Sequence, residues 1–188
     1  MPRDINDSTN AIQKNDIKAE ILDWTKHILI ALVIAFILAR FVIVNANIPT
    51  SSMESTIMVN DRIIASRLHY LFTTPERGNI VVFKYPDDEN LLYVKRIIGM
   101  PGETVSINKG AVYIDGKKLD EPYISVSITG NFGPYTVPEG SYFMLGDNRN
   151  NSLDSRYWTN KFVSKDKILG KAIFKYYPLQ DFEVFGNN

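Results

Sequence analysis

The chain has 188 residues, of which 45% are hydrophobic and 22% are charged, a composition that is ordinary for globular proteins and excludes wholesale disorder. Lysine plus arginine and aspartate plus glutamate number 21 each, so the formal net charge is zero and the chain has no general basic field for nucleic acid. Cysteine is absent, and the two histidines, His27 and His69, are too few and too far apart for a histidine-based metal site. We therefore expect no cofactor, no metal and no nucleic-acid partner.

A transmembrane helix is predicted at Trp24–Val44, whose sequence is WTKHILIALVIAFILARFVIV. From Ile28 onward only Arg40 is charged, and about 20 apolar residues in a helix span a bilayer core of roughly 30 Å. A buried core helix of this length is rare in a small domain. A cleavable signal peptide is the closer alternative, because Val44-Asn45-Ala46 has the spacing of a cleavage site. The long acidic region before the stretch and the charge of Arg40 favour a retained anchor.

The distribution of positive charge predicts the orientation of this anchor. Three lysines precede the main apolar run, and no lysine or arginine follows it until Arg62. Because positive charge favours the cytoplasmic side, we expect a cytoplasmic tail at residues 1–23 and an extracytoplasmic domain at residues 45–188. The chain is thus expected to be a single-pass protein of the cell membrane.

The region after Asn45 predicts an all-β domain. Its β-branched and aromatic residues occur in short segments, and these segments are separated by residues typical of turns. The signals Asn108-Lys109-Gly110 and Asp115-Gly116 are typical of tight turns between short strands. The expected strands are Asn79–Tyr85, Leu91–Met100, Thr104–Asn108, Ala111–Ile114, Ser141–Leu145 and Ile168–Tyr177.

Lys95 is the first candidate catalytic residue. On the strand Leu91–Met100 it shares a face with Tyr93 and Ile97, because alternate residues of a strand point to the same side. If this face is internal, burial lowers the pKa of the lysine, and the neutral amine can take a proton from a hydroxyl. An exposed lysine whose stem covers apolar neighbours is the commoner meaning of such a residue. Arg96 points to the opposite face, so we expect one member of the pair to be solvated.

Two polar segments are further candidates. Pro49-Thr50-Ser51-Ser52-Met53 follows the predicted membrane exit directly, and its hydroxyls suit the rim of an active site at the bilayer surface. An ordinary loop of serine and threonine is the simpler interpretation. The segment 146–156, GDNRNNSLDSR, alternates acidic and basic residues, which indicates ion pairs that brace an irregular loop rather than a purely solvated surface.

Together these segments closely resemble type I signal peptidases of the bacterial serine–lysine kind. SSMESTI at 51–57 resembles the family's nucleophile segment, in which the serine before methionine attacks, and YVKRIIGMPGE at 93–103 resembles its lysine segment. RGNIVVFKYP at 77–86 and GDNRNNSLDSRYW at 146–158 resemble two further segments, in the same order and spacing. The resemblance covers about residues 20–177 and implies a serine endopeptidase that removes signal peptides from exported pre-proteins.

The resemblance also implies a role for each site residue. Ser52 would be the nucleophile and Lys95 the general base, with Ser152 hydrogen-bonding to the lysine amine and orienting it. The oxyanion hole would use the backbone N–H of Ser52 and the hydroxyl of Thr50. Four charged residues would support the site without carrying protons: Asp147, Arg149, Asp154 and Arg156. The implied partners are the lipid bilayer and signal peptides with small residues before the cut, of the Ala-X-Ala type.

The fold that the resemblance implies is a coil of antiparallel β-sheets whose active site faces the membrane. Because the segment between the lysine and closing segments is short, the second domain of some relatives should be reduced to a small hairpin-rich insert at about residues 108–137. Ser55 stands where the family usually has proline. Without proline's fixed φ, we expect a looser backbone just after the nucleophile.

Other functions fit parts of this pattern. A non-catalytic binding protein anchored in the membrane explains the topology, but it leaves Ser52, Lys95 and Ser152 as a coincidence. A specialised serine–lysine processing peptidase of the same fold would keep the site and change the substrate. A self-cleaving repressor would carry a DNA-binding or partner segment in place of the membrane span. A Ser-His-Asp hydrolase would need His69, whose neighbours Leu68 and Tyr70 form no recognisable base motif.

Overall fold

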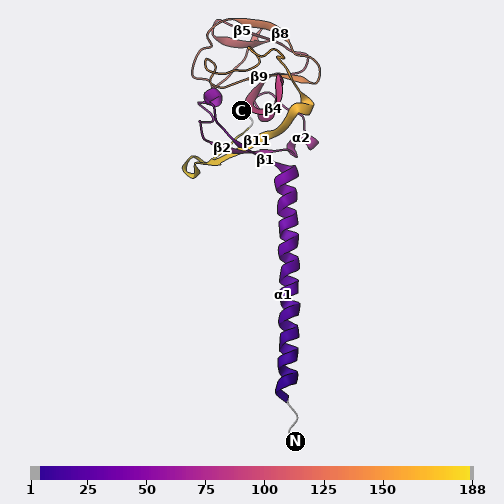
Figure 1. Cartoon of the computed structure of the whole chain (residues 1–188). Coiled ribbons are helices and arrows are strands. Elements are labelled where there is room, and N and C mark those ends of the chain that lie inside the picture. Colours follow the sequence, from indigo (N-terminus) through magenta and orange to yellow (C-terminus); the bar gives the residue numbers. More distant parts are fainter. Residues whose placement is uncertain (1–4, 187–188) are drawn as a thin grey trace. The chain divides into compact units, whose positions relative to one another are not determined.

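The computed structural model describes residues 5–186 and divides the chain into two units, Met1–Phe41 and Val42–Asn188 (Figure 1). Residues 1–4 of the predicted cytoplasmic tail and residues 187–188 of the predicted extracytoplasmic domain lie outside the described part. All the site residues predicted from the sequence lie in the second unit.

The first unit is helical. Helix α1 spans Ile5–Ile37, and a π-helical turn, η1, follows at Leu38–Val42. The predicted span at residues 24–44 therefore differs from α1 at both ends, and Ile43 and Val44 belong to strand β1. Among the described residues, no helix is long and apolar enough to cross a membrane.

Antiparallel strands form most of the second unit, so the predicted β class is confirmed. The larger sheet has eight strands in the order β1-β2-β11-β3-β4-β9-β10, with β12 paired to β11. Its strands are β1 (Ile43–Asn47), β2 (Arg62–Ser66), β3 (Ile80–Tyr85), β4 (Asp88–Gly99), β9 (Ser141–Leu145), β10 (Val163–Ser164), β11 (Ile168–Tyr177) and β12 (Glu183–Val184). All pairings between the described strands are antiparallel.

A second sheet of four strands, in the order β7-β6-β5-β8, lies at the end of the second unit opposite β1 (Figure 1). Its strands are β5 (Thr104–Asn108), β6 (Ala111–Ile114), β7 (Lys117–Lys118) and β8 (Phe132–Thr136). The region expected to be a small hairpin-rich insert, residues 108–137, thus shares a complete sheet with β5, which precedes it. Short helical turns connect the strands of the unit: η2 (Ser51–Met53), α2 (His69–Phe72), η3 (Lys165–Lys167) and η4 (Leu179–Asp181).

The strand bounds expected from the sequence agree closely with the observed ones. β5, β6, β9 and β11 have the bounds expected of them, and β3 differs by one residue. β4 starts earlier than expected, at Asp88, because Asp88 pairs with Tyr85 and extends the ladder past the apolar run. The two predicted tight turns also form. Lys109 and Gly110 have φ of 47° and 78°, and Asp115 and Gly116 have φ of 50° and 78°, as a type I′ turn requires.

Buried apolar side chains fix the segment that follows β1. Met53 and Ile57 are 1% and 0% exposed, and they pack in one cluster with Ile63 of β2 and Val82 of β3. Because dense packing restricts movement, this cluster holds the serine-containing turn η2 firmly against the larger sheet.

Candidate active site

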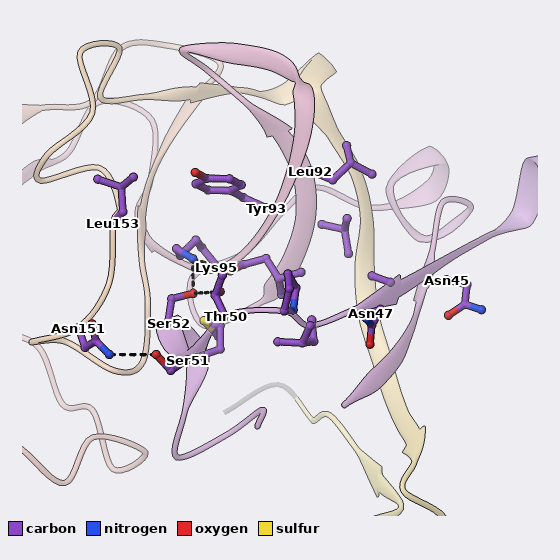
Figure 2. A pocket seen from close by; sticks show the side chains of 16 residues that line it. Asn45, Asn47, Thr50, Ser51, Ser52, Leu92, Tyr93, Lys95, Asn151 and Leu153 are labelled. Atoms are coloured by element: carbon purple, nitrogen blue, oxygen red, sulfur yellow. Dashed lines mark hydrogen bonds between the residues drawn. The ribbon is translucent and has the colours of Figure 1, made fainter. Parts of the chain in front are cut away.

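Ser52 and Lys95 meet in the folded chain although 43 residues separate them. Ser52 lies in η2, beside buried Met53, and Lys95 lies on β4 opposite Val81 of β3. Lys95 Nζ donates a hydrogen bond to Ser52 Oγ at 2.6 Å and another to the Val94 carbonyl at 3.0 Å (Figure 2). Both side chains are almost fully buried, with Ser52 9% and Lys95 3% exposed. The face of β4 that carries Lys95 is therefore internal.

The environment of Lys95 disfavours its charge. Burial lowers the pKa of Lys95 from 10.5 to about 8, while the more distant carboxylates of Asp154 and Asp147 act in the opposite direction. Both hydrogen-bond acceptors of the amine, Ser52 Oγ and the Val94 carbonyl, are neutral. A substantial fraction of the amine is consequently neutral near physiological pH, which is the state that a general base needs.

Arg96 is also buried, at 2% exposure, so the expectation that one residue of the pair is solvated is wrong. Its Nε and Nη2 donate to the two carboxylate oxygens of Asp147 at 2.9 and 2.7 Å, and Nη1 donates to the Gly78 carbonyl at 2.8 Å. The centre of the Tyr123 ring lies 3.9 Å from the guanidinium carbon of Arg96. The physical reason is that β4 lies between β3 and β9 and its C-terminal half is covered on both faces.

A cleft of about 500 Å³ opens beside Ser52 and Lys95. β1, η2 and β4 line it, and Asn151 and Leu153 stand on the opposite side (Figure 2). Thr50 lines the same cleft, and its Oγ1 is 3.3 Å from Ser52 Oγ. The cleft therefore presents two hydroxyls and a partly neutral amine to any chain that enters it.

Ser152 is buried close to this group, but the structure shows no hydrogen bond between its hydroxyl and the Lys95 amine. No described residue forms a hydrogen bond with Ser152 Oγ, because the Lys95 amine is directed to Ser52 and Val94. Gly146 has no side chain, which allows Ser52 and Ser152 to approach its backbone closely. A Cβ built at Gly146 would collide with the Ser52 carbonyl oxygen and would lie 2.7 Å from Ser152 Cβ. Only glycine fits at this position.

The charged residues of the segment 146–156 form buried ion pairs, as their spacing indicated. Asp154 accepts hydrogen bonds from Arg156 Nε and Nη2, both at 2.8 Å. Asp147 pairs with Arg96 rather than within the segment, and Arg149 pairs with Glu121 at 2.6 and 3.0 Å. These pairs leave the loop rigid rather than solvated.

Sequence reasoning missed several residues that join the serine segment to the rest of the site. Thr56 Oγ1 donates to Asp147 at 2.6 Å, and Asn148 N donates to the Ser52 carbonyl at 3.1 Å. Glu121 and Tyr123, from the loop between β7 and β8, hold Arg149 and Arg96. These contacts join residues far apart in the chain. Thr56 and Asn148 lie inside the recognised segments 51–57 and 146–158, but nothing local indicates their partners, and Glu121 and Tyr123 lie outside every recognised segment.

Ser55 adopts a φ of 87°, in the left-handed region, and its hydroxyl donates to the Tyr123 carbonyl at 3.5 Å. Proline is locked near a φ of about −65° and could not adopt this backbone. The serine therefore fits a turn that differs from one built around proline, and the hydrogen bond attaches it to the loop before β8.

No group of three or more histidine, aspartate or glutamate side chains within the described part of the chain could hold a metal ion. What the site offers is a hydroxyl, an amine that burial has made partly neutral, and backbone N–H groups at a turn. This set suits nucleophilic attack on a carbonyl with proton transfer to the amine.

Known proteins resemble the chain over most of its length. The family model for signal peptidase, peptidase S26, matches residues 21–177. A probable signal peptidase I-2 from Synechocystis is 42% identical over 84% of this chain and 74% of its own length, and a signal peptidase I from Bacillus amyloliquefaciens is 37% identical over 90% and 95%. A crystal structure of a signal peptidase I from Enterococcus faecalis is 37% identical and covers 53% of this chain and 97% of its own, with a TM-score of 0.46.

The chain is similar to signal peptidases over most of its length, and its β-rich unit contains a buried serine–lysine contact. It is therefore a hydrolase of the serine endopeptidase class. The chain belongs to the signal peptidase family, peptidase S26.

Proposed function

We propose that the chain removes signal peptides with Ser52 as nucleophile and Lys95 as general base. The contact of 2.6 Å between Lys95 Nζ and Ser52 Oγ, at an amine whose pKa burial lowers to about 8, carries the proposal. The neutral amine takes the hydroxyl proton as Ser52 Oγ attacks the scissile carbonyl. The tetrahedral intermediate then collapses, the proton passes to the departing amine, and the same lysine activates the water that hydrolyses the acyl-enzyme.

The oxyanion is proposed to form between the backbone N–H of Ser52 and the Thr50 hydroxyl. Thr50 Oγ1 lies 3.3 Å from the attacking oxygen, within reach of a carbonyl bound to that oxygen. We assign Ser152 the role of orienting the lysine amine. Its buried hydroxyl has no hydrogen-bond partner among the described residues, and a buried hydroxyl without a partner is costly, which supports a bond to the nearby amine during the reaction.

The substrate is proposed to be the end of a signal peptide in extended form, with small residues of the Ala-X-Ala type. The cleft contains apolar side chains of modest size near the serine, among them Ala46, Ile48 and Val94. Shallow apolar walls of this kind hold a methyl group and exclude a larger side chain sterically. The polar chain of the substrate would lie along β1, whose residues 45–47 line the same cleft.

We propose that the apolar helical segment up to Val42 anchors the chain in the cell membrane, with the N-terminus in the cytoplasm. Its large apolar side chains are exposed among the described residues, including Leu32 at 62% and Phe36 at 66%. Apolar surface of this extent is stable only in an apolar environment, which a bilayer supplies. The second unit would then act outside the cytoplasm, where exported pre-proteins emerge.

The function is tested by incubating the full chain in detergent with a pre-protein and sequencing the new N-terminus. We expect cleavage after a small residue, and loss of cleavage in Ser52→Ala. Ser51→Ala is the matched control, because the Ser51 hydroxyl accepts a hydrogen bond from Asn151 and takes no part in the proposed chemistry. An active Ser52→Ala variant would exclude this serine as the nucleophile, and a product cut after a large residue would exclude the proposed specificity.

A further inference from the structure

A second groove lies in the second unit, away from the cleft that contains Ser52. It has a volume of about 500 Å³, and α2 and η3 contribute to its walls. The groove shares no lining residue with the active-site cleft. Its polar side chains are Arg67, Tyr70, Lys165 and Asp166, and its apolar ones are Leu71, Pro75 and Ile168.

The cations of this groove have no partner within the described part of the chain. Neither Arg67 nor Lys165 forms a side-chain hydrogen bond or ion pair with a described residue, and Arg67 Nε is buried without an acceptor. The acid of the groove, Asp166, is already engaged, since it accepts a hydrogen bond from Ser164 at 2.6 Å and lies 3.6 Å from Lys167. The groove therefore presents uncompensated positive charge, in contrast to the paired arginines around the active site.

Leu71 lines the groove with these cations, and the next residue, Phe72, is a second large apolar side chain of α2. Leu71 and Phe72 of α2 are 71% and 85% exposed. Neither residue belongs to a core cluster of the described chain. Exposed apolar side chains on the short helix that lines a cationic groove suit the boundary between lipid headgroups and acyl chains.

Arg67 is bonded to the first residue of the second unit, where the proposed anchor ends. The Arg67 N–H donates to the Val42 carbonyl at 2.8 Å, and the preceding residue, Ser66, pairs with Ile43. Val42 is the last residue of the helical segment that we propose as the membrane anchor. A residue bonded to the end of a membrane-spanning segment lies at the depth where phosphate headgroups are found.

We propose that this groove binds the phosphate headgroup of an anionic phospholipid, with Arg67 and Lys165 as the contacting cations and with Leu71 and Phe72 in the acyl region. The inference rests on the proposed membrane anchor and extends it with a second, lipid-specific attachment of the enzyme unit. Arginine suits this ligand because its planar guanidinium binds two phosphate oxygens at once. The attachment orients the active-site unit against the membrane and makes its position depend on lipid charge.

The full chain, reconstituted in vesicles, tests this binding. Because the sequence has no cysteine, Phe72→Cys accepts a polarity-sensitive fluorophore at one position only. We expect its emission to shift to the blue, and a lipid-soluble quencher to reduce it, in phosphatidylcholine vesicles with about one third phosphatidylglycerol but not in phosphatidylcholine alone. Val126→Cys, exposed at 60% in the loop before β8, is the matched label and should remain in water in both vesicles.

Removal of the groove's charge should abolish the lipid dependence. Each cation near an anionic surface strengthens contact about fivefold, so Arg67→Gln with Lys165→Gln should lower the ratio of inserted to aqueous label about twenty-five-fold. Lys117→Gln with Lys118→Gln removes the same charge from exposed β7 and should leave the ratio unchanged. Pre-protein cleavage in detergent, measured for every variant, establishes that each one is folded.

Three results would contradict the proposal. A chain that floats with the vesicles and cleaves pre-protein, but keeps the Phe72 label in water in both compositions, contradicts the lipid site and leaves the proposed function intact. Release of the label from the membrane by millimolar inorganic phosphate would assign the groove to a soluble anion. A chain that floats with neither vesicle contradicts the anchor and the lipid site together.

Discussion

Lys95 and Arg96 show how neighbouring basic residues acquire opposite properties from their partners. Both are buried, but Lys95 meets only neutral acceptors and a Tyr93 ring 5.3 Å away, whereas Arg96 meets the carboxylate of Asp147 in a bidentate pair. Desolvation therefore lowers the pKa of the lysine, whereas the ion pair with Asp147 compensates the buried charge of the arginine. Strand parity predicted that the two residues face opposite sides of β4. It could not predict that both sides are covered, because that depends on strands distant in sequence.

Burial of Lys95 should reduce the stability of the fold at neutral pH. Its folded pKa is about 8 and its ordinary value is 10.5, so the unfolded chain binds the proton more tightly. The cost, about 3 kcal/mol, is fully present below pH 8 and disappears as the pH rises towards 10.5. Lys95→Met should thus unfold at a higher temperature than the unaltered chain at pH 7, with a smaller difference at pH 10. An advantage of the variant that does not shrink as the pH rises would contradict the lowered pKa.

Thr50 tests the proposed oxyanion hole. Thr50→Ala removes the hydroxyl, and loss of one such donor typically lowers kcat on the order of 10² to 10³-fold with little change in KM. Thr50→Ser keeps the donor and should retain most of the activity. The measurement is steady-state cleavage of a signal-peptide substrate, with thermal melts to establish folding. Equal kcat values for the alanine and serine variants would exclude Thr50 from the oxyanion hole.

At the scale of elements, the loop between β7 and β8 acts as a brace for the active site. Glu121 pairs with Arg149, and the Tyr123 hydroxyl donates to Glu121 at 3.0 Å while its ring covers Arg96. The sequence motifs on which the site was predicted do not include this loop. It contributes because the second sheet folds back to the segment 146–156.

Glu121→Gln should destabilise the chain strongly. The Arg149 and Glu121 side chains are only 1% and 9% exposed, and loss of one partner leaves a buried guanidinium uncompensated at a cost of about 3–5 kcal/mol. Glu89→Gln is the matched control, because Glu89 is 49% exposed and its solvent-screened pairs with Lys84 and Lys167 should contribute little to stability. Thermal melts of both variants measure the difference. Equal effects of the two substitutions would show that the loop does not brace the site.

The sequence predicted the strands better than their arrangement. The period of alternation and the turn residues are local, so strands such as β5 and β6 and their type I′ turns could be read directly. β1 was missed because Ile43 and Val44 continue the apolar run of the preceding helix. The sheet order β1-β2-β11-β3 joins strands from both ends of the unit, and no local pattern records such pairings.

Local sequence patterns also limit what could be predicted of the active site. Lys95 could be singled out by parity, but the preference for Ser52 over Ser51 came from the family resemblance and not from spacing. The structure distinguishes the two by their contacts, since Ser52 Oγ receives the Lys95 hydrogen bond and Ser51 Oγ receives one from Asn151. The bond between Thr56 and Asp147 spans 91 residues, a separation over which a single sequence carries no pairing signal.

For the whole molecule, the proposed anchor predicts that the N-terminal tail and the second unit lie on opposite sides of the membrane. Protease added to intact protoplasts should degrade the second unit and spare a tag at the N-terminus, since positive charge before the apolar segment favours the cytoplasmic side. Permeabilised cells, in which the tag should also be lost, are the control. Protection of the second unit in intact protoplasts would reverse the proposed orientation.

The most direct test of the serine–lysine mechanism is the pH dependence of kcat for pre-protein cleavage, because only the neutral form of Lys95 can accept the serine proton. The lowered pKa predicts that kcat rises about tenfold per pH unit below pH 8 and levels off above it, and that Lys95→Arg, whose guanidinium stays protonated, is inactive throughout. A kcat that stays constant between about pH 6 and pH 9, or a Lys95→Arg variant that cleaves at a rate near that of the unaltered chain, would contradict the mechanism.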